Sequence, residues 1–235
     1  MKPTANQLMG KQAKRIKKLF KSATSNKEKT ILSLFDKSGV WSKPYKDAGY
    51  TVIQVDLAYG DDVFEIMVDA TQQVAEGKQE GIKVNVYGIL AAPPCTDFAG
   101  SGARWWKGKE KQPANYENKH TIGFKNTLEH SVAMVYCIEE IVAQLDPVFW
   151  VIENPVGRLG KLVPDIGKPW YFQPSDFGDL YTKKTGLWGK FNIPKKTPVL
   201  PLLGSIMQSK MGSKDKDKRS KTPAGFAKAF FEANQ

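Results

Sequence analysis

The chain has 235 residues, of which 41% are hydrophobic, so it can bury a sizeable core and does not belong to the disordered class. No apolar run approaches the roughly 18 residues of a membrane span, and the N-terminus lacks the apolar segment of a secretory signal. We therefore expect no membrane partner. The formal net charge of +11 favours a polyanionic partner.

The positive charge is concentrated in two segments. Residues 1–29 carry a net charge of +8 and residues 208–221 carry +4, which leaves the rest of the chain close to neutral. A neutral body with two basic arms suits nucleic acid, because phosphate neutralisation supplies most of the affinity for it. The alternative is that these charges are solvated runs that only aid solubility.

The first predicted unit is a basic arm or helix over residues 1–29. Its apolar residues recur at helical spacing, with lysines on the other face. It could pack on the domain, contact nucleic acid or lie on a membrane surface. A basic, acid-poor start is also typical of an organelle transit peptide.

The second predicted unit, residues 30–207, alternates short apolar runs with helical patterns. Predicted strands cover residues 31–35, 51–56, 63–68, 86–90, 148–152 and 186–193. Predicted helices cover residues 41–48, 71–79 and 128–145, and residues 99–119 are predicted to form a long loop. The alternation predicts an α/β fold, Rossmann-like, with a mostly parallel sheet and helices on both faces.

The third predicted unit, residues 208–235, is a basic linker followed by a C-terminal helix that packs back on the domain. The linker is low in complexity and is expected to be mobile. The helix is predicted to begin with Thr222 as N-cap and Pro223 as the first helical residue.

Two motifs with chemical potential follow two predicted strands. Pro93-Pro94-Cys95-Thr96-Asp97-Phe98 comes after the strand over 86–90, and Glu153-Asn154-Pro155 comes after the strand over 148–152. In an α/β sheet, ligands gather at the carboxyl ends of neighbouring strands. A thiolate beside a carboxyl group can attack a pyrimidine ring and stabilise the adduct. Alternatively, Cys95 is a small residue in a turn and Glu153 caps a neighbouring loop.

A cofactor site is predicted after the first two strands. The first strand leads into a turn from Phe35 to Gly39, and the second ends at Asp56, about 20 residues on, as in nucleotide-binding folds. A methyl donor such as S-adenosylmethionine needs such a turn and such an acid for its ribose. Asp69 is a further candidate, for the adenine amino group.

Over most of residues 31–193 the motifs resemble those of the DNA (cytosine-5) methyltransferases. The resemblance implies a class I S-adenosylmethionine-dependent fold and methyl transfer to C5 of a flipped-out cytosine in double-stranded DNA. It implies catalytic roles for Cys95, Glu153, Asn154 and Lys183. It implies cofactor contacts for Phe35, Gly39, Asp56, Asp69 and Pro94.

The chain departs from the family pattern at several positions. Lys37 stands where the cofactor loop usually has a glycine, and Pro155 follows Glu-Asn where the family has valine. The Gln-x-Arg-x-Arg motif is matched by residues 181–185, where Lys183 can supply a cation but Thr185 has no guanidinium. Few residues remain for a target-recognition domain. These features resemble compact, phage-encoded members, and we expect a monomer with low sequence selectivity in the cytoplasm of a bacterial or phage-infected cell.

Nucleic-acid contacts are predicted in two places. In the loop over 99–119, aromatic rings could stack on bases while cations grip phosphates; the alternative is a packed aromatic loop. The predicted contact residues are Arg104, Trp105, Trp106, Lys107, Lys183 and Lys184.

Three alternative functions stay open. RNA (tRNA) cytosine-5 methyltransferases share this motif set. A catalytically silent nucleic-acid-binding relative is favoured by the altered cofactor loop. An exocyclic amino methyltransferase is disfavoured, because such enzymes have an aromatic residue at the position of Cys95. With two isolated cysteines and two histidines we expect no metal site, no disulfide framework and a buried thiol at Cys137.

Overall fold

The computed structural model describes residues 25–65, 86–111, 123–205 and 219–235. Predictions that fall on the remaining residues lie outside the described part of the chain. These are the helix within residues 1–24, the helix over 71–79, Asp69 and most of the basic linker.

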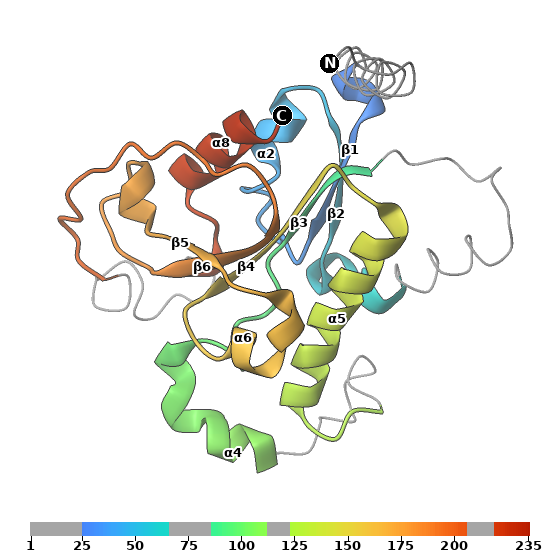
Figure 1. Cartoon of the computed structure of the whole chain (residues 1–235), viewed down its shortest axis with the longest axis vertical. Coiled ribbons are helices and arrows are strands. Elements are labelled where there is room, and N and C mark those ends of the chain that lie inside the picture. Colours follow the sequence, from blue (N-terminus) through green and yellow to red (C-terminus); the bar gives the residue numbers. More distant parts are fainter. Residues whose placement is uncertain (1–24, 66–85, 112–122, 206–218) are drawn as a thin grey trace, which may run out of the picture.

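The described residues contain one sheet of six strands, in the order β2-β1-β3-β4-β6-β5 (Figure 1). The strands are β1 (Thr30–Leu34), β2 (Thr51–Val55), β3 (Val86–Ala91), β4 (Phe149–Pro155), β5 (Trp170–Phe172) and β6 (Thr185–Lys190). Strands β2, β1, β3 and β4 pair in parallel, whereas β6 runs antiparallel to both β4 and β5. The predicted α/β fold is confirmed, with a mixed sheet.

Helices cover both faces of this sheet. The α-helices are α2 (Lys43–Asp47), α4 (Trp106–Lys111), α5 (Thr127–Leu145), α6 (Leu159–Leu162) and α8 (Ala224–Ala233). Short 3-10 helices are η1 (Asn26–Glu28), η2 (Leu57–Tyr59), η3 (Gly100–Trp105), η5 (Pro164–Ile166) and η6 (Pro174–Phe177). None of the described helices is both long enough and apolar enough to cross a bilayer.

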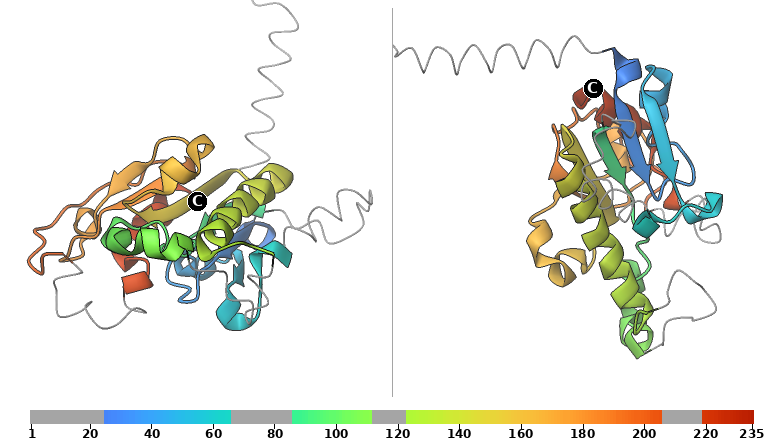
Figure 2. Two further views of the ribbon diagram at one scale, coloured as in Figure 1. Left: turned by 90° about the horizontal axis from the view of Figure 1, so that it is seen from below. Right: turned by 90° about the vertical axis from the view of Figure 1, so that its right-hand side faces the viewer.

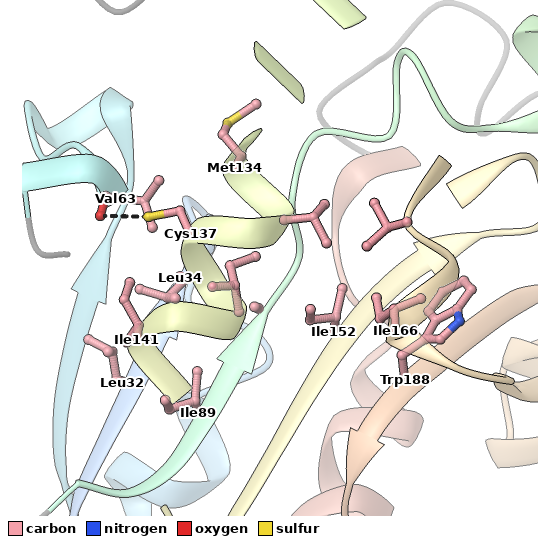
Figure 3. Close-up of a cluster of buried hydrophobic side chains, with 14 of the residues drawn as sticks. Leu32, Leu34, Val63, Ile89, Met134, Cys137, Ile141, Ile152, Ile166 and Trp188 are labelled. Atoms are coloured by element: carbon pink, nitrogen blue, oxygen red, sulfur yellow. Dashed lines mark hydrogen bonds between the residues drawn. The ribbon is translucent and has the colours of Figure 1, made fainter. Parts of the chain in front are cut away.

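The face covered by α5 is largely aliphatic. Alternate strand residues such as Leu32, Ile89 and Ile152 meet one side of α5, where Ile141 is fully buried (Figure 3). Cys137 is a free, buried thiol in this cluster, and its Sγ donates to the carbonyl oxygen of Val63 over 3.4 Å. The predicted burial of Cys137 is confirmed.

The opposite face is largely aromatic. Phe226 and Phe230 of α8 are fully buried there with Trp41, which lies just before α2, and Tyr45, which lies in it. The rings of Phe226 and Phe172 stack with their centroids 4.1 Å apart. The C-terminal helix therefore forms part of the core on this face. Along each strand, the residues that point to this face alternate with those that point to α5.

Three predicted elements were wrong in detail, and one strand was not predicted. The strand over 63–68 begins as helix at 63–65, where Asp62 Oδ1 accepts from the backbone N–H of Phe64. The loop over 99–119 is helical over 100–111. The C-terminal helix has Pro223 as N-cap and begins one residue later than expected. Strand β5, only three residues long, was missed because so short a run has no readable period.

The most consequential difference concerns β4. The strand does not end before Glu153 but continues through Asn154 and Pro155, because β6 pairs along its whole length. Glu153 lies opposite Leu187 in this antiparallel ladder. The carboxyl group is therefore held by a rigid strand rather than by a loop.

Candidate active site

The ends of β1, β2 and β3 lie in one row with Ile152 of β4. Leu34 pairs with Val55 and with Ala91, and Ala91 pairs with Ile152. The residues that follow, including Phe35, Asp56 and Glu153, therefore share one edge of the sheet. Neighbouring strands lie about 4.8 Å apart. The cysteine motif after β3 therefore lies next to the Glu-Asn motif of β4, and the predicted cofactor segments after β1 and β2 lie next to each other on the same edge.

Cys95 lies in a tight turn beyond β3. Its carbonyl oxygen accepts hydrogen bonds from the backbone N–H groups of Phe98 over 3.0 Å and of Ala99 over 2.8 Å. The side chain is half-buried and forms no disulfide. The turn fixes the backbone on which the thiol is carried.

Glu153 and Lys183 form an ion pair at this edge. Glu153 Oε1 and Lys183 Nζ are 3.9 Å apart, and the side chains are 14% and 16% exposed. Lys183 lies two residues before β6, the strand that holds the backbone of Glu153. At this length and depth the pair compensates in part for the loss of hydration of both charges.

Cys95 follows β3, the neighbour of β4, and lies within electrostatic range of this ion pair. Burial raises the pKa of the Cys95 thiol, and the positive charge of Lys183 opposes this shift. The negative charge of Glu153 raises the thiol pKa further, while Arg219 lowers it. Burial likewise raises the pKa of Glu153, again against Lys183. The structure thus brings Cys95, Glu153 and Lys183 together, and their chemical roles stay predictions.

Asn154 joins the two motifs. Its side chain is fully buried, and Nδ2 donates to the carbonyl oxygen of Pro93 over 3.1 Å. The contact shows that the side chain holds the Pro-Pro-Cys segment, while the predicted role of Asn154, to orient Glu153 or the loop, stays a prediction. Pro94, one residue on, is exposed.

The loops after β3 and β4 are also joined through their backbones. The backbone N–H of Gly100 donates to the carbonyl oxygen of Val156 over 2.8 Å. The backbone N–H of Arg158 donates to the carbonyl oxygen of Phe98 over 2.9 Å. Gly157 lies between these bonds, and a Cβ on it would overlap the carbonyl oxygen of Phe98. This close approach requires glycine.

A buried polar network extends from the thiol turn to α4 and α5. Asp97 Oδ2 accepts from Ser131 Oγ over 2.8 Å, and its carbonyl oxygen accepts from Arg158 Nε over 2.8 Å. Lys109 of α4 donates to the carbonyl oxygen of Thr96 over 2.9 Å and lies 3.3 Å from Asp97 Oδ1. Helix α4 is therefore attached to the residues that directly follow Cys95. Figure 2 shows it at the N-terminal end of α5.

The predicted nucleic-acid contacts differ in exposure. Trp105 is 59% exposed, and the guanidinium of Arg104 lies 4.9 Å from its ring centre. Trp106 instead lies against Arg158, whose guanidinium is 4.4 Å from the ring centre. Lys107 is exposed, as is Lys184, whose ammonium group lies 4.9 Å from the ring centre of Tyr171. Trp105 is thus the indole of this pair that solvent reaches most freely.

The loop after β1 has the shape expected of a tight turn. Phe35 and Gly39 have φ values of 59° and 64°, in the left-handed region. Between them, the buried Asp36 carboxylate accepts from the hydroxyl groups of Ser33, Ser38 and Ser42. Asp36 holds the turn in place of a glycine-rich sequence.

Asp56 lies beside this turn. It is the N-cap of η2, and its Oδ1 accepts from the backbone N–H of Ala58 over 2.8 Å. The hydroxyl group of Tyr59, in η2, donates to the carbonyl oxygen of Lys37 over 2.6 Å. The residue at the departure from the family pattern, Lys37, thus connects the two predicted cofactor segments through its backbone.

Sequence reasoning missed several residues of this site. Asp97 stands inside the cysteine motif but received no role, and Arg158 has no signal at all. Arg219 was counted only as one charge of the basic linker. Its contact with Lys183, whose Nζ donates to the Arg219 carbonyl oxygen over 3.1 Å, joins residues 36 positions apart. No spacing rule reveals such a contact.

No protein-family model and no curated protein matches the chain. Among solved structures, the chain is similar to a proposed DNA modification methyltransferase encoded within a prophage (E. coli), with 16% sequence identity and a TM-score of 0.44. The match covers 76% of this chain and 53% of that protein, so this chain spans about half its length.

Proposed function

We propose that the chain is an S-adenosylmethionine-dependent methyltransferase that acts on C5 of cytosine in DNA. The observation that carries this proposal is the convergence of the Cys95 thiol and the Glu153 carboxyl group, with Lys183, at one edge of the sheet. The mixed sheet with helices on both faces is compatible with the class I fold that the motifs imply.

The chemistry needs both groups. The Cys95 thiolate would add to C6 of cytosine, which forms a C–S bond and turns the ring into an enamine with a nucleophilic C5. Glu153 would hold N3 and donate a proton to it as the ring gains electron density. After C5 has gained the methyl group, a base would remove the C5 proton, the C6–S bond would break, Cys95 would leave as a thiolate, and the proton on N3 would return to Glu153.

The raised pKa of Glu153 suits its role, whereas the raised pKa of Cys95 opposes formation of the thiolate. Burial raises the pKa of Glu153, which favours the protonated carboxyl that N3 requires. Burial also raises the pKa of Cys95, so the thiolate depends on the nearby positive charge of Lys183. The positive charge of Lys183 would therefore act on two groups. It would stabilise the Cys95 thiolate, and it would balance the negative charge of Glu153 when that group is ionised.

The residues after β1 and β2 fit the methyl donor. The turn from Phe35 to Gly39 brings two left-handed residues to the sheet edge, and the half-buried Asp56 lies beside it. Phe35, Gly39 and Asp56 would hold S-adenosylmethionine, which supplies the methyl group. The adjoining position of this turn and the Cys95 turn, after neighbouring strands β1 and β3, would bring donor and acceptor together.

DNA would approach across η3, where Arg104 and Trp105 are exposed. A base must leave the helical stack before Cys95 can reach C6. An exposed indole with an adjacent guanidinium can stack on bases without reading their sequence, which suits low selectivity. We propose a monomer acting on double-stranded DNA.

The test is a covalent trap. Fluorine at C5 cannot leave as a proton does, so DNA containing 5-fluorocytosine, with S-adenosylmethionine, should give a stable protein–DNA complex on denaturing gels. Cys95→Ala should abolish the complex, while Cys137→Ala, the matched control in the core, should retain it. Absence of any complex with the wild type would refute thiolate addition.

Two further measurements separate the rival functions. The same trap with 5-fluorocytosine in tRNA reports an RNA substrate, and a complex with tRNA alone would overturn the assignment to DNA. Calorimetry with S-adenosylmethionine tests the silent alternative, since a protein that only binds nucleic acid has no need of the cofactor. Bisulfite sequencing of DNA from expressing cells would then report the target sequence.

A further inference from the structure

Arg219 differs in burial from Lys221, the other described charge of the basic linker. Lys221, two residues on, is exposed, as expected of a solvated charge. Arg219 Nε, by contrast, is buried away from solvent. Water screens the charge of a buried side chain less than that of an exposed one, so the charge of Arg219 acts more strongly on its surroundings.

The backbone of Arg219 contacts the same lysine that serves Cys95 and Glu153. Lys183 Nζ donates to the Arg219 carbonyl oxygen over 3.1 Å and lies 3.9 Å from Glu153 Oε1. The ammonium group is thus held from two sides, by the strand that carries Glu153 and by the segment that precedes α8. Losing either partner would release it from the thiol site.

We propose that Arg219 is a positioning residue for the reaction at Cys95: its carbonyl oxygen holds Lys183 in place, and its guanidinium supplies a second positive charge that stabilises the thiolate. The role of the thiolate rests on the proposed function, but its ionisation can be measured without nucleic acid or cofactor. The charge arrangement agrees, since burial raises the Cys95 pKa while Lys183 and, to a smaller extent, Arg219 lower it.

The test is the pH profile of Cys95 alkylation by iodoacetamide in the full-length protein, read from the Cys95 peptide by mass spectrometry. Only the thiolate reacts, so the rate follows the fraction ionised. Arg219→Gln should slow alkylation about three- to tenfold below the thiol pKa, as expected when one of two nearby positive charges is lost, and the rates should converge at high pH. Arg219→Lys, which keeps the charge, should stay closer to the wild type.

The matched control is Lys228→Gln, which removes an exposed charge from α8. Its profile should equal that of the wild type. An equal slowing in Lys228→Gln would show that net charge alone is responsible and would overturn the proposal. A profile of Arg219→Gln that coincides with the wild type would overturn it as well.

Thermal unfolding of each variant excludes a general loss of structure. If Arg219→Gln does not fold, the alkylation profile of Arg219→Lys decides. A profile close to that of the wild type supports a role of the charge. Alkylation in Arg219→Lys that is slowed as much as in Lys183→Gln contradicts that role. The 5-fluorocytosine trap keeps the two proposals apart. A trap that forms with an unaltered Arg219→Gln profile rejects the role of Arg219 only, while a shifted profile without any trap rejects the reaction only.

Discussion

The loop after β1 and the paired loops after β3 and β4 lie on the same edge of the sheet but are held in different ways. In the first loop, the partners of the Asp36 carboxylate lie at most six positions away along the chain. In the second region, Asn154 reaches Pro93 and Arg158 reaches Asp97, each across 61 positions. The carboxylate network of the first turn can form from local residues, whereas the thiol site exists only once β3 and β4 have paired.

Substitution of Gly157 should have the largest effect. In Gly157→Ala the added Cβ overlaps the Phe98 carbonyl oxygen, so the two loops must separate. We expect a loss of about 3 kcal/mol or more in the free energy of unfolding, measured by urea denaturation, together with loss of the 5-fluorocytosine trap.

The control for this variant is Gly108→Ala in α4, where nothing lies near the added Cβ. It should be neutral or stabilising by up to about 1 kcal/mol, because alanine favours the helix. Equal destabilisation by both substitutions would show that the join between the loops is unimportant.

Substitution of Asp36 should come second. Asp36→Ala removes the acceptor shared by three serine hydroxyl groups, two of them on the buried residues Ser33 and Ser42. We expect a loss of about 2–3 kcal/mol in unfolding free energy, and weaker binding of S-adenosylmethionine in calorimetry.

Asp47→Ala serves as the matched control, because its carboxylate is exposed and pairs only with the exposed Lys43 among the described contacts. It should cost no more than about 0.5 kcal/mol. If Asp36→Ala is as mild as Asp47→Ala, the first loop does not depend on its local network.

Glu153→Gln should have the smallest effect on stability and a large one on reaction rate. Because burial raises the pKa of Glu153, this group favours the folded state below its ordinary pKa, and that contribution is lost as pH rises through the raised value. In the variant, the unfolding free energy should therefore not fall in this way as pH rises. At neutral pH it should be no lower than that of the wild type. Methyl transfer should fall about a hundredfold or more.

The corresponding measurement is thermal unfolding of both proteins from acidic to mildly alkaline pH. A wild type that gains stability relative to Glu153→Gln as pH rises would contradict the raised pKa. That result would mean that Lys183 outweighs burial.

The comparison also explains what the sequence could predict. The strands, the α5 face, the Cys137 burial and the two motifs at the sheet edge follow from period and from turn residues, which are local. The extension of β4 through Pro155 depends on pairing with β6, and the helical form of residues 100–111 depends in part on Lys109 reaching Thr96. Arg158, Arg219 and the need for Gly157 arise from tertiary contacts, which leave no trace in spacing.

Helix α8 has a consequence for biosynthesis. Phe226 and Phe230 complete the aromatic side of the core beneath strands that are made much earlier. During translation those strands must wait, with an apolar surface uncovered, until α8 has emerged from the ribosome. Nascent chains stalled before residue 226 should therefore be captured by chaperones, and Cys95 should acquire its final environment only after α8 has packed.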